Sequence, residues 1–336
     1  MSITDLLSKF HEEESLPGGY NPAVKSLRLF LGNLPPQPMG REVIRASGLS
    51  FLCPREFVLN YWNPRPVKSF DWSSQFKMSI GTDLHSFLQN YVMGPMGVLY
   101  GTWKKTGDKS TIYKEGFHPD PEKTVWEMQN QAPLTWRFEE ERVWNEKWRI
   151  RGHIDGRVSK KRLDFLTSSV KLVKEDLLSA VKACMDIKDD DLVLYEIKST
   201  GTYAYNGITE VSKIPEYYKM QASVYQWLSG CNETIFLYLE RDNIKMRGFS
   251  YVGEKGWVKD AKRKAKIVWE SIRDEVLPES AMACKCPTDK RAKSCAFKKE
   301  CWAPPTDFKK WVSECRARGS KNGLSFLDLS KEEYDY

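Results

Sequence analysis

An acidic and a basic residue stand two positions apart near the end of a predicted β-strand. The stretch "LVLYEIKST", residues 192–200, runs from apolar and aromatic residues into Glu196, Ile197 and Lys198. Side chains i and i+2 of a strand share a face, so Glu196 and Lys198 project together and Ile197 projects to the other side. A solvated surface pair is the simplest explanation, and only the neighbouring motifs can favour a chemical role over it.

A second carboxylate, Asp155, ends another predicted strand in "RGHIDGRV". The glycines on both sides let the backbone pass close to another group. We expect the two strands to be neighbours, which would bring Asp155 and Glu196 together as oxygen ligands of a hard divalent cation. Such a cation lowers the pKa of a bound water and neutralises charge on a phosphate under attack, and Lys198 could orient that water or stabilise the oxyanion. These residues predict phosphodiester hydrolysis.

Helices and strands that could position these residues alternate along the chain. Apolar spacing predicts a helix over residues 76–93 with His85 in its first turns. Alternating residues predict two strands within residues 135–158, and residues 215–230 begin with Pro and end with Gly as helices do. The remaining elements are two strands and a basic amphipathic helix, over residues 234–241, 244–252 and 254–278. This order predicts one α/β domain around a mixed central β-sheet flanked by helices.

Four short motifs follow one another in an order that resembles the PD-(D/E)XK nuclease superfamily. They are "GTDLH" with His85, "GHID" with Asp155, "EIK" with Glu196 and Lys198, and "QASVY" with Gln221 and Tyr225. The order is similar to that of the RecB-like exonucleases, which include the CRISPR-associated RecB-like exonuclease and the nuclease domain of AddAB-type helicase–nucleases. The resemblance implies a restriction-endonuclease-like core.

The resemblance also implies roles for these residues. The implied ligands of a Mg²⁺ or Mn²⁺ ion are His85, Asp155, Glu196 and the backbone carbonyl of Ile197. Lys198 would assist the catalytic water. Gln221 and Tyr225 are four positions apart and so share a helix face, from which they would contact DNA or hold Lys198 in place.

We expect three regions in the chain. Residues 1–45 contain "SLPGGYNP" and "LGNLPPQPMG" and predict a loop-rich N-terminal arm. Residues 46–278 would form the nuclease core, with an insert over about residues 159–191 that separates Asp155 from Glu196 more widely than is usual in the family. Residues 279–336 form a basic, cysteine-rich C-terminal segment.

Eight cysteines suggest a metal cluster rather than disulfides, because an intracellular compartment keeps thiols reduced. The layout resembles the iron–sulfur branch of the RecB-like nucleases, in which four thiolates clasp a [4Fe–4S] cluster. The implied ligands are Cys53, Cys286, Cys295 and Cys301, with Cys284 as an alternative to Cys286. The alternative stays open because Ala292 stands where the family has its cysteine, and a Zn²⁺ site is the second interpretation. Cys184, Cys231 and Cys315 are expected to be small buried thiols.

The charge distribution favours a polyanionic partner, nucleic acid first. The chain has a formal charge of +7, and residues 254–321 hold eighteen Lys or Arg against ten Asp or Glu. Tyr61 and Trp62 beside Arg65, or Trp269, could stack bases, but we expect most of these aromatic residues to pack in the core. No apolar run predicts a membrane span and the N-terminus does not resemble a signal peptide, so we expect a cytoplasmic protein.

The resemblance implies a DNA exonuclease that acts on single-stranded or frayed ends, often 5′ to 3′, in recombination, replication or repair. A structure-specific or restriction-type endonuclease is the first alternative, since the same metal core serves both. A DNA-binding scaffold with a silent or partner-activated nuclease centre is the second. The sequence has no Walker A motif, so any unwinding would come from a helicase or recombination partner.

Overall fold

The computed structural model describes residues 41–65, 72–105, 111–188, 191–243, 245–279, 283–321, 324–327 and 329. Residues 1–40 of the expected loop-rich arm lie outside the described residues. The chain divides into two compact units, one of which includes the helical residues 72–80, while the other holds residues 41–65 and the described residues from Gly81 onward. Every contact described below lies within the second unit.

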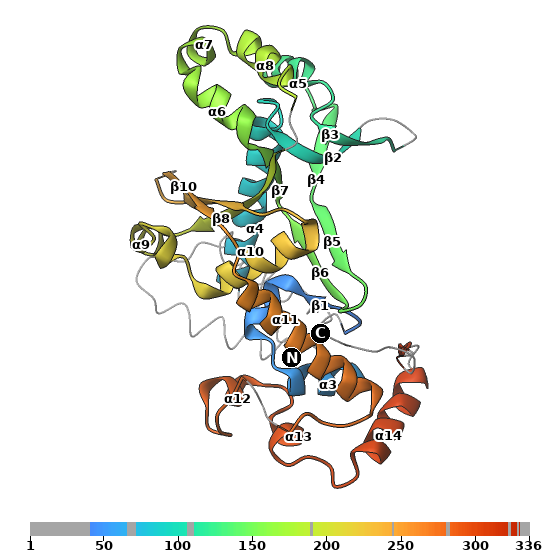
Figure 1. Ribbon diagram of the computed structural model, residues 1–336. Helices are drawn as coiled ribbons and strands as arrows, with labels where there is room; N and C mark the ends of the chain where they lie inside the picture. Colours follow the sequence, from blue (N-terminus) through green and yellow to red (C-terminus); the bar gives the residue numbers. More distant parts are fainter. Residues whose placement is uncertain are drawn as a thin grey trace, which may run out of the picture. The chain divides into compact units, whose positions relative to one another are not determined.

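Ten strands form two sheets in this described part of the chain (Figure 1). The three-stranded sheet has the order β1 (Ile44–Arg45), β6 (Ile150–Ile154) and β5 (Glu141–Asn145). The seven-stranded sheet has the order β10 (Met246–Tyr251), β9 (Thr234–Glu240), β8 (Leu192–Thr200), β7 (Gly156–Ser159), β2 (Leu99–Lys105) and β3 (Tyr113–Phe117), with β4 (Trp136–Glu139) also paired to β2. Strand β8 pairs parallel with β9 and antiparallel with β7. The predicted mixed α/β fold is confirmed.

Helices flank these sheets. The longer ones are α3 (Pro54–Trp62), α4 (Trp72–Phe87), α5 (Pro121–Gln129), α10 (Glu216–Ser229), α11 (Lys255–Arg273) and α14 (Phe308–Lys321). The shorter ones are η1 (Ala46–Phe51), η2 (Leu88–Met93), α9 (Thr202–Gly207), η3 (Val211–Lys213), α12 (Lys290–Ser294) and α13 (Lys298–Trp302). Helix α10 begins directly after Pro215 and ends before Gly230, whose φ of 76° is typical of a glycine at a helix C-terminus. His85 lies in the last turn of α4, so its predicted place in the first turns was wrong, because the helix already begins at Trp72.

Strand β8 alternates between two buried clusters, as its sequence predicted. Val193, Tyr195 and Ile197 belong to one cluster, whereas Leu194 belongs to another that includes residues of α10 and α11. Glu196 therefore shares the face of Leu194, where α10 lies. The period of two residues has placed the acid and the base on the helix-covered side of the strand.

Three helices occupy the stretch expected to be an insert, residues 159–191. They are α6 (Lys160–Ser168), α7 (Val170–Glu175) and α8 (Leu177–Met185). They join the ends of β7 and β8 where Ser159 pairs with Leu192, whereas Gly156 pairs with Tyr195 at the other end of the ladder. The inserted helices therefore lie at the end of the β7–β8 ladder that is far from Asp155.

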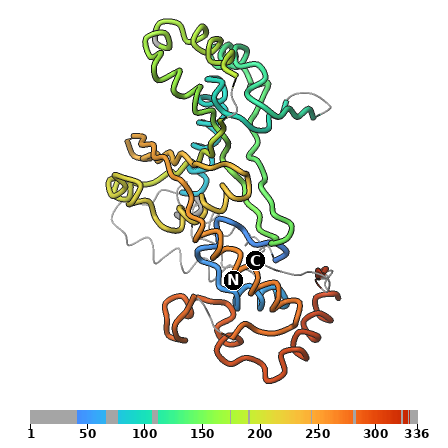
Figure 2. The backbone as a smooth tube through the Cα atoms, viewed as in Figure 1, coloured from blue at the N-terminus to red at the C-terminus, as the bar shows by residue number. Residues whose placement is uncertain are grey.

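Helix α3 lies against α11 and the C-terminal helices α13 and α14 (Figure 2). The guanidinium of Arg55 donates hydrogen bonds to the carbonyls of Glu279 (2.9 Å) and Cys301 (2.7 Å). The backbone N–H of Leu327 donates to the hydroxyl of Tyr61 at 2.7 Å. These contacts join segments more than 200 residues apart in the sequence through ordinary hydrogen bonds.

The aromatic residues proposed above to stack bases are in the core. Tyr61, Trp62 and Trp269 are 0%, 3% and 0% exposed, and the indole N–H of Trp269 donates to the carbonyl of Trp148 at 2.9 Å. Core packing, the favoured expectation for most of these aromatic residues, is confirmed for all three, and base stacking by them was wrong. Long aromatic side chains favour burial whatever charge stands beside them in the sequence.

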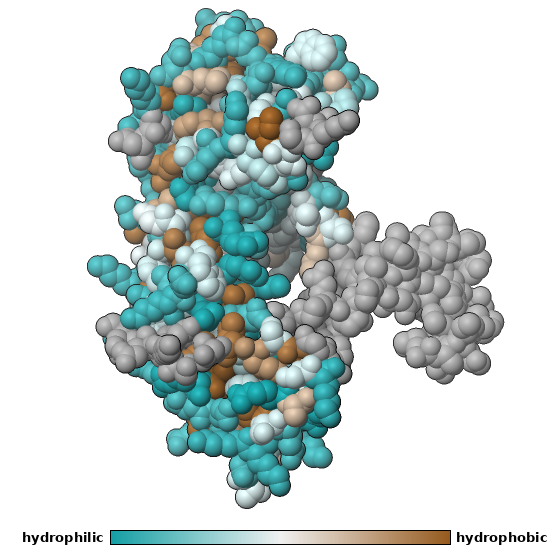
Figure 3. Space-filling view, turned by 90° about the vertical axis from the view of Figure 1, so that its right-hand side faces the viewer, coloured by the Kyte–Doolittle hydropathy of each residue, from teal (hydrophilic) through white to brown (hydrophobic). Residues whose placement is uncertain are grey.

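The surface is dominated by polar residues. Figure 3 shows one face that is largely hydrophilic, with apolar residues in small groups. Helix α11 buries Ala261, Ala265 and Val268, while its lysines are exposed or half-buried. Among the described residues, no helix combines the length and apolar character that crossing a membrane requires.

Strand β6 passes close to α10 at Gly152. A Cβ atom on Gly152 would lie 2.2 Å from Cε1 of the Tyr225 ring, and Tyr225 is only 3% exposed. The glycine that precedes "HID" in the sequence thus provides the space in which the tyrosine of "QASVY" sits.

We expect Gly152→Ala to destabilise the fold by about 1–3 kcal/mol, because strand and ring would have to separate in a closely packed region. Urea unfolding of the purified variant measures this. Gly248→Ala is the matched control, since Gly248 also lies in a strand and its added Cβ would meet nothing within 4 Å. Equal unfolding midpoints for the two variants would contradict the expectation.

Candidate metal centre

Three side chains with metal-ligating atoms converge beside β8. The ligating atoms of His85, Glu140 and Asp155 lie within 4.8 Å of one another, and Nδ1 of His85 is 3.4 Å from Oδ1 of Asp155. Asp155 is buried, His85 is half-buried and Glu140 is exposed, so the group is open to solvent on the side of Glu140. Carboxylate oxygens are preferred ligands of Mg²⁺ and Mn²⁺, and this group could hold a divalent cation.

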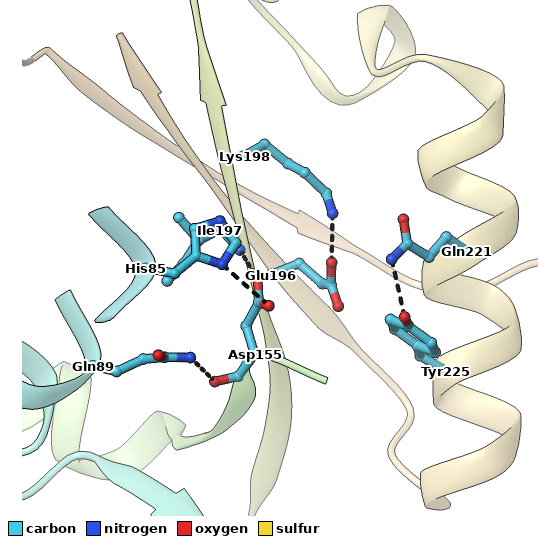
Figure 4. A network of polar contacts seen from close by, with 8 residues as sticks. All are labelled: His85, Gln89, Asp155, Glu196, Ile197, Lys198, Gln221 and Tyr225. Atoms are coloured by element: carbon cyan, nitrogen blue, oxygen red, sulfur yellow. Dashed lines mark hydrogen bonds and ion pairs between the residues drawn. The ribbon is translucent and has the colours of Figure 1, made fainter. Parts of the chain in front are cut away.

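Asp155 stands alone between β6 and β7, where the chain leaves the three-stranded sheet and enters the seven-stranded one. The next residue, Gly156, has a φ of 152°, which L side chains rarely adopt. Oδ2 of Asp155 accepts the backbone N–H of Ile197 at 2.6 Å, and its backbone carbonyl accepts the amide of Gln89 at 2.8 Å (Figure 4). These two hydrogen bonds fix the residue and leave Oδ1 directed to His85.

His85 is presented by the last turn of α4, which runs close to β8. A Cβ on Gly81 would lie 3.2 Å from Oγ of Ser199, so the glycine of "GTDLH" permits this approach. Burial would lower the pKa of the imidazole, but the hydrogen bond with Asp155 and the charge of that carboxylate outweigh burial and raise the pKa. A bound cation would instead require the neutral imidazole as its ligand.

Glu196 and Lys198 form a buried ion pair, with 2.6 Å between Oε2 and Nζ and only 2% and 12% of their side chains exposed (Figure 4). Burial raises the pKa of the Glu196 carboxyl to about 7, although the neighbouring ammonium of Lys198 opposes this shift. Burial would lower the pKa of Lys198, but the charges of Glu196 and Asp155 raise it overall. Lys198 is therefore held as a cation inside the protein.

The second carboxylate oxygen of Glu196 has no hydrogen-bond partner among the described residues, although it is buried. Unpaired buried polar atoms are uncommon because the lost hydration is not replaced. The charges of Asp155 and His85 both act on Glu196, so its carboxylate belongs to the same electrostatic group. Glu196, a predicted ligand, is not among the three residues whose ligating atoms lie within 4.8 Å of one another. Its buried oxygen, which has no partner among the described residues, is a further atom that a divalent cation could bind.

Gln221 and Tyr225 face the site from α10. The amide of Gln221 donates to the hydroxyl of Tyr225 at 3.1 Å (Figure 4). Burial, followed by the charge of Glu196, raises the pKa of Tyr225, so its hydroxyl stays protonated. The contacts described for the ammonium of Lys198 are with Glu196 and with the Tyr218 ring, whose centre is 4.7 Å away. They do not include Gln221 or Tyr225, which one of the two expected roles would have placed against Lys198.

Glu140 is a site residue that the motif analysis missed. It lies between β4 and β5, and the next residue, Glu141, pairs with Ile154 across β5 and β6. Glu140 therefore stands opposite Asp155, one position past the paired strands. The signal in the sequence was the run Glu139–Glu141 inside the first of the two strands predicted over residues 135–158, which only the register of β5 on β6 connects to Asp155.

Four thiols lie near one another beside α3. Cys53 and Cys301 are buried, whereas Cys284 and Cys295 are half-buried. Burial raises the pKa of Cys295 to about 11, with Glu56, Cys53 and Cys301 adding to this shift. The pKa of Cys301 is raised by burial first and then by Cys53 and Cys284. The four thiols therefore form one neighbourhood.

Cys286 lies apart from this neighbourhood. It is exposed, and its Sγ lies 3.2 Å from the hydroxyl of Thr288, a hydrogen bond that lowers its pKa. Among the alternatives left open by the sequence, Cys284 is the thiol close to Cys53. Cys184 and Cys315 are buried as expected, and Cys231 is half-buried.

Comparisons with solved structures give distant similarities, two of which are described here. No family model and no curated protein matches the chain. The crystal structure of SSO0001 is similar with a TM-score of 0.36 and 13% identity, over 84% of this chain and 95% of that one. An alkaline exonuclease from Laribacter hongkongensis has a TM-score of 0.36 and 9% identity, over 75% of this chain and 93% of that one. Both scores are low, so we base the functional conclusion on the geometry of the site.

We expect the purified protein to bind Mn²⁺, and Glu140→Gln to weaken that binding about tenfold or more, in line with losses seen when metal sites lose a supporting group. Electron paramagnetic resonance of free Mn²⁺ during titration measures the affinity without any reaction. Glu139→Gln is the matched control, because Glu139 pairs with Lys104 instead (3.3 Å). Unchanged affinity in Glu140→Gln would exclude Glu140 as a ligand.

Proposed function

We propose that the protein is a metal-dependent DNA exonuclease of the PD-(D/E)XK type that hydrolyses phosphodiester bonds. The observation that carries this proposal is the buried pair of Glu196 and Lys198 beside the group of His85, Glu140 and Asp155. It combines a cation donor set, a carboxylate oxygen that has no partner in the described part of the chain, and a permanent positive charge. Those are the components that hydrolysis of a charged phosphodiester requires.

The proposed ligands of the cation are His85, Glu140, Asp155, Glu196 and the backbone carbonyl of Ile197. When bound, a Mg²⁺ or Mn²⁺ ion would activate water and offset charge on the phosphate. Lys198 stays protonated because of its carboxylate neighbours, so it would orient the attacking water and stabilise negative charge on the phosphate oxygens. Glu196 fixes the position of Lys198, and the ring of Tyr218 limits its movement from the other side.

Gln221 and Tyr225 would form the wall of the site that faces the nucleic acid. Their mutual hydrogen bond and the burial of Tyr225 fix both side chains on α10. Their proposed task is to position the substrate rather than to exchange protons, because burial and the charge of Glu196 raise the pKa of Tyr225. The lysines of α11 and the basic C-terminal segment favour DNA as the partner. We propose ends of single-stranded or frayed DNA as substrate and a role in recombination, replication or repair, with unwinding supplied by a helicase partner.

With Mg²⁺ or Mn²⁺, we expect the wild-type protein to release short products from one end of labelled single-stranded DNA. We expect Lys198→Ala to reduce this activity by at least about 100-fold, as is typical when a charge-stabilising donor is removed. Substrates labelled at the 5′ or the 3′ end give the polarity. A circular single strand of the same sequence separates the two nuclease interpretations, because an exonuclease leaves it intact.

Lys245→Ala is the matched control, since Lys245 is an exposed lysine on the loop before β10. Thermal unfolding of Lys198→Ala tests whether the loss comes from misfolding, because removal of one partner of a buried ion pair can cost about 3–5 kcal/mol. Full activity in a folded Lys198→Ala variant would exclude the proposed centre. Binding without cleavage by the wild type would favour the scaffold interpretation.

We further propose that Cys53, Cys284, Cys295 and Cys301 hold a [4Fe–4S] cluster. No three of the described thiols lie within 4.8 Å of one another, whereas a single tetrahedral zinc ion with Zn–S bonds of about 2.3 Å would hold its sulfurs about 4 Å apart. A four-iron cube spaces its thiolates more widely than one ion does. The cluster would add a covalent link between α3 and the C-terminal segment and so offset loop-closure entropy.

We expect protein purified without oxygen to be brown and to contain about four irons per chain. Cys53→Ser and Cys284→Ser should lose the colour and iron and unfold at lower temperature, whereas the matched control Cys286→Ser should keep both. Iron analysis and visible absorbance measure the outcome. A colourless anaerobic preparation that contains one zinc would favour the zinc site, and loss of iron in Cys286→Ser alone would exclude Cys284 as the fourth ligand.

A further inference from the structure

A series of aromatic rings leads from the surface to Lys198. The ring of Phe51 lies 5.3 Å from that of Tyr217, which lies 4.2 Å from that of Tyr218, centre to centre. The Tyr218 ring is in turn 4.7 Å from Nζ of Lys198. We call Phe51, Tyr217 and Tyr218 the aromatic strip. Its inner end is the lysine of the candidate centre.

The outer rings of the strip are exposed without a structural need. Phe51 is 54% exposed and Tyr217 is 37% exposed, whereas Leu49 in the same turn of η1 is fully buried and holds that turn in the core. The rings are tilted by 43° and 54° to one another. Partly exposed aromatic rings next to one another can stack the bases of a nucleic acid.

Two cations lie beside the strip, and each also pairs with a carboxylate, Lys264 with Asp260 at 3.1 Å and Arg291 with Glu56 at 3.4 Å. The ammonium of Lys264 donates to the carbonyl of Leu49 at 3.0 Å, and the guanidinium of Arg291 donates to the carbonyl of Phe51. The side chain of Arg291 remains 33% exposed. Burial and the neighbouring Tyr218 raise the pKa of Tyr217 to about 12, so Tyr217 carries no negative charge that would repel a phosphate.

We propose that the aromatic strip binds the bases of a single-stranded nucleic acid and directs its backbone to Lys198. The proposal rests on the proposed function and adds the binding site that selects the form of the substrate. Bases of a single strand expose their flat faces and stack on aromatic side chains, with positive charge nearby for the phosphates. Paired bases inside a duplex are already stacked on their neighbours and offer no free faces along the strand.

The test measures binding separately from cleavage. Fluorescence anisotropy in EDTA gives the dissociation constants of full-length wild type and variants for labelled oligo-dT and for a blunt DNA hairpin. We expect Phe51→Leu and Tyr217→Leu each to weaken oligo-dT binding about tenfold, within the range known for base stacking, and to leave hairpin binding unchanged. Tyr217→Phe should bind like the wild type, because it keeps the ring.

Trp126→Leu is the matched control, since Trp126 is an exposed aromatic residue on α5 (57%) outside the strip. Because Phe51 and Tyr217 are exposed, we expect their variants to fold. Unfolding temperatures equal to that of the wild type would establish this. Wild-type affinity in both strip variants, or an equal loss for oligo-dT and the hairpin, would overturn the proposal. If the wild type cleaves no DNA but the strip variants bind oligo-dT more weakly, the proposed function alone is contradicted. If cleavage depends on Lys198 but the strip variants bind oligo-dT like the wild type, the strip alone is contradicted.

Discussion

One hydrogen bond, from the backbone N–H of Ile197 to Oδ2 of Asp155, determines the arrangement of the candidate centre. It joins the bend between the two sheets to the strand that carries Glu196 and Lys198. A carboxylate is a strong acceptor, and a short hydrogen bond to it inside the protein is among the stronger polar contacts. Because one oxygen of Asp155 is used for structure, the other is left to face His85, and the same residue serves the fold and the site.

The centre carries an electrostatic cost that the fold alone does not explain. Glu196 and Lys198 are both removed from water, and an apolar pair of similar volume would often be at least as stable. The carboxylate of Asp155 adds negative charge to the same region, and Oε1 of Glu196 lacks a partner among the described residues. A divalent cation would reduce all of these costs at once, which is the physical reason to interpret the cluster as a metal centre.

The segment of η1 and α3 connects this centre with the C-terminal part of the chain. Phe51 ends η1 and is followed two residues later by Cys53, which precedes α3. The same segment therefore supplies the outer ring of the aromatic strip and one thiol of the proposed cluster. Hydrogen bonds from Arg55 and Arg291 hold it to the C-terminal segment, so the position of the strip depends on how the chain closes around α3.

Much of the local structure could be predicted from the sequence. The period of two in β8 correctly placed Glu196 with Lys198 on one face and Ile197 on the other, and Pro215 and Gly230 correctly bounded α10. These features follow from backbone geometry and from the special conformations of proline and glycine, which act over a few residues. The mixed α/β fold followed in the same way from the order of such elements.

Contacts between distant residues were decided by the tertiary structure alone. Glu140 joins His85 only through the register of β5 on β6, and Cys284 lies near Cys53 and Cys301 only because of how the C-terminal segment folds onto α3. The buried state of Trp269 likewise depends on what packs over α11. Periodicity specifies which way a side chain points within its own element, but strand pairing and helix packing specify what it meets there.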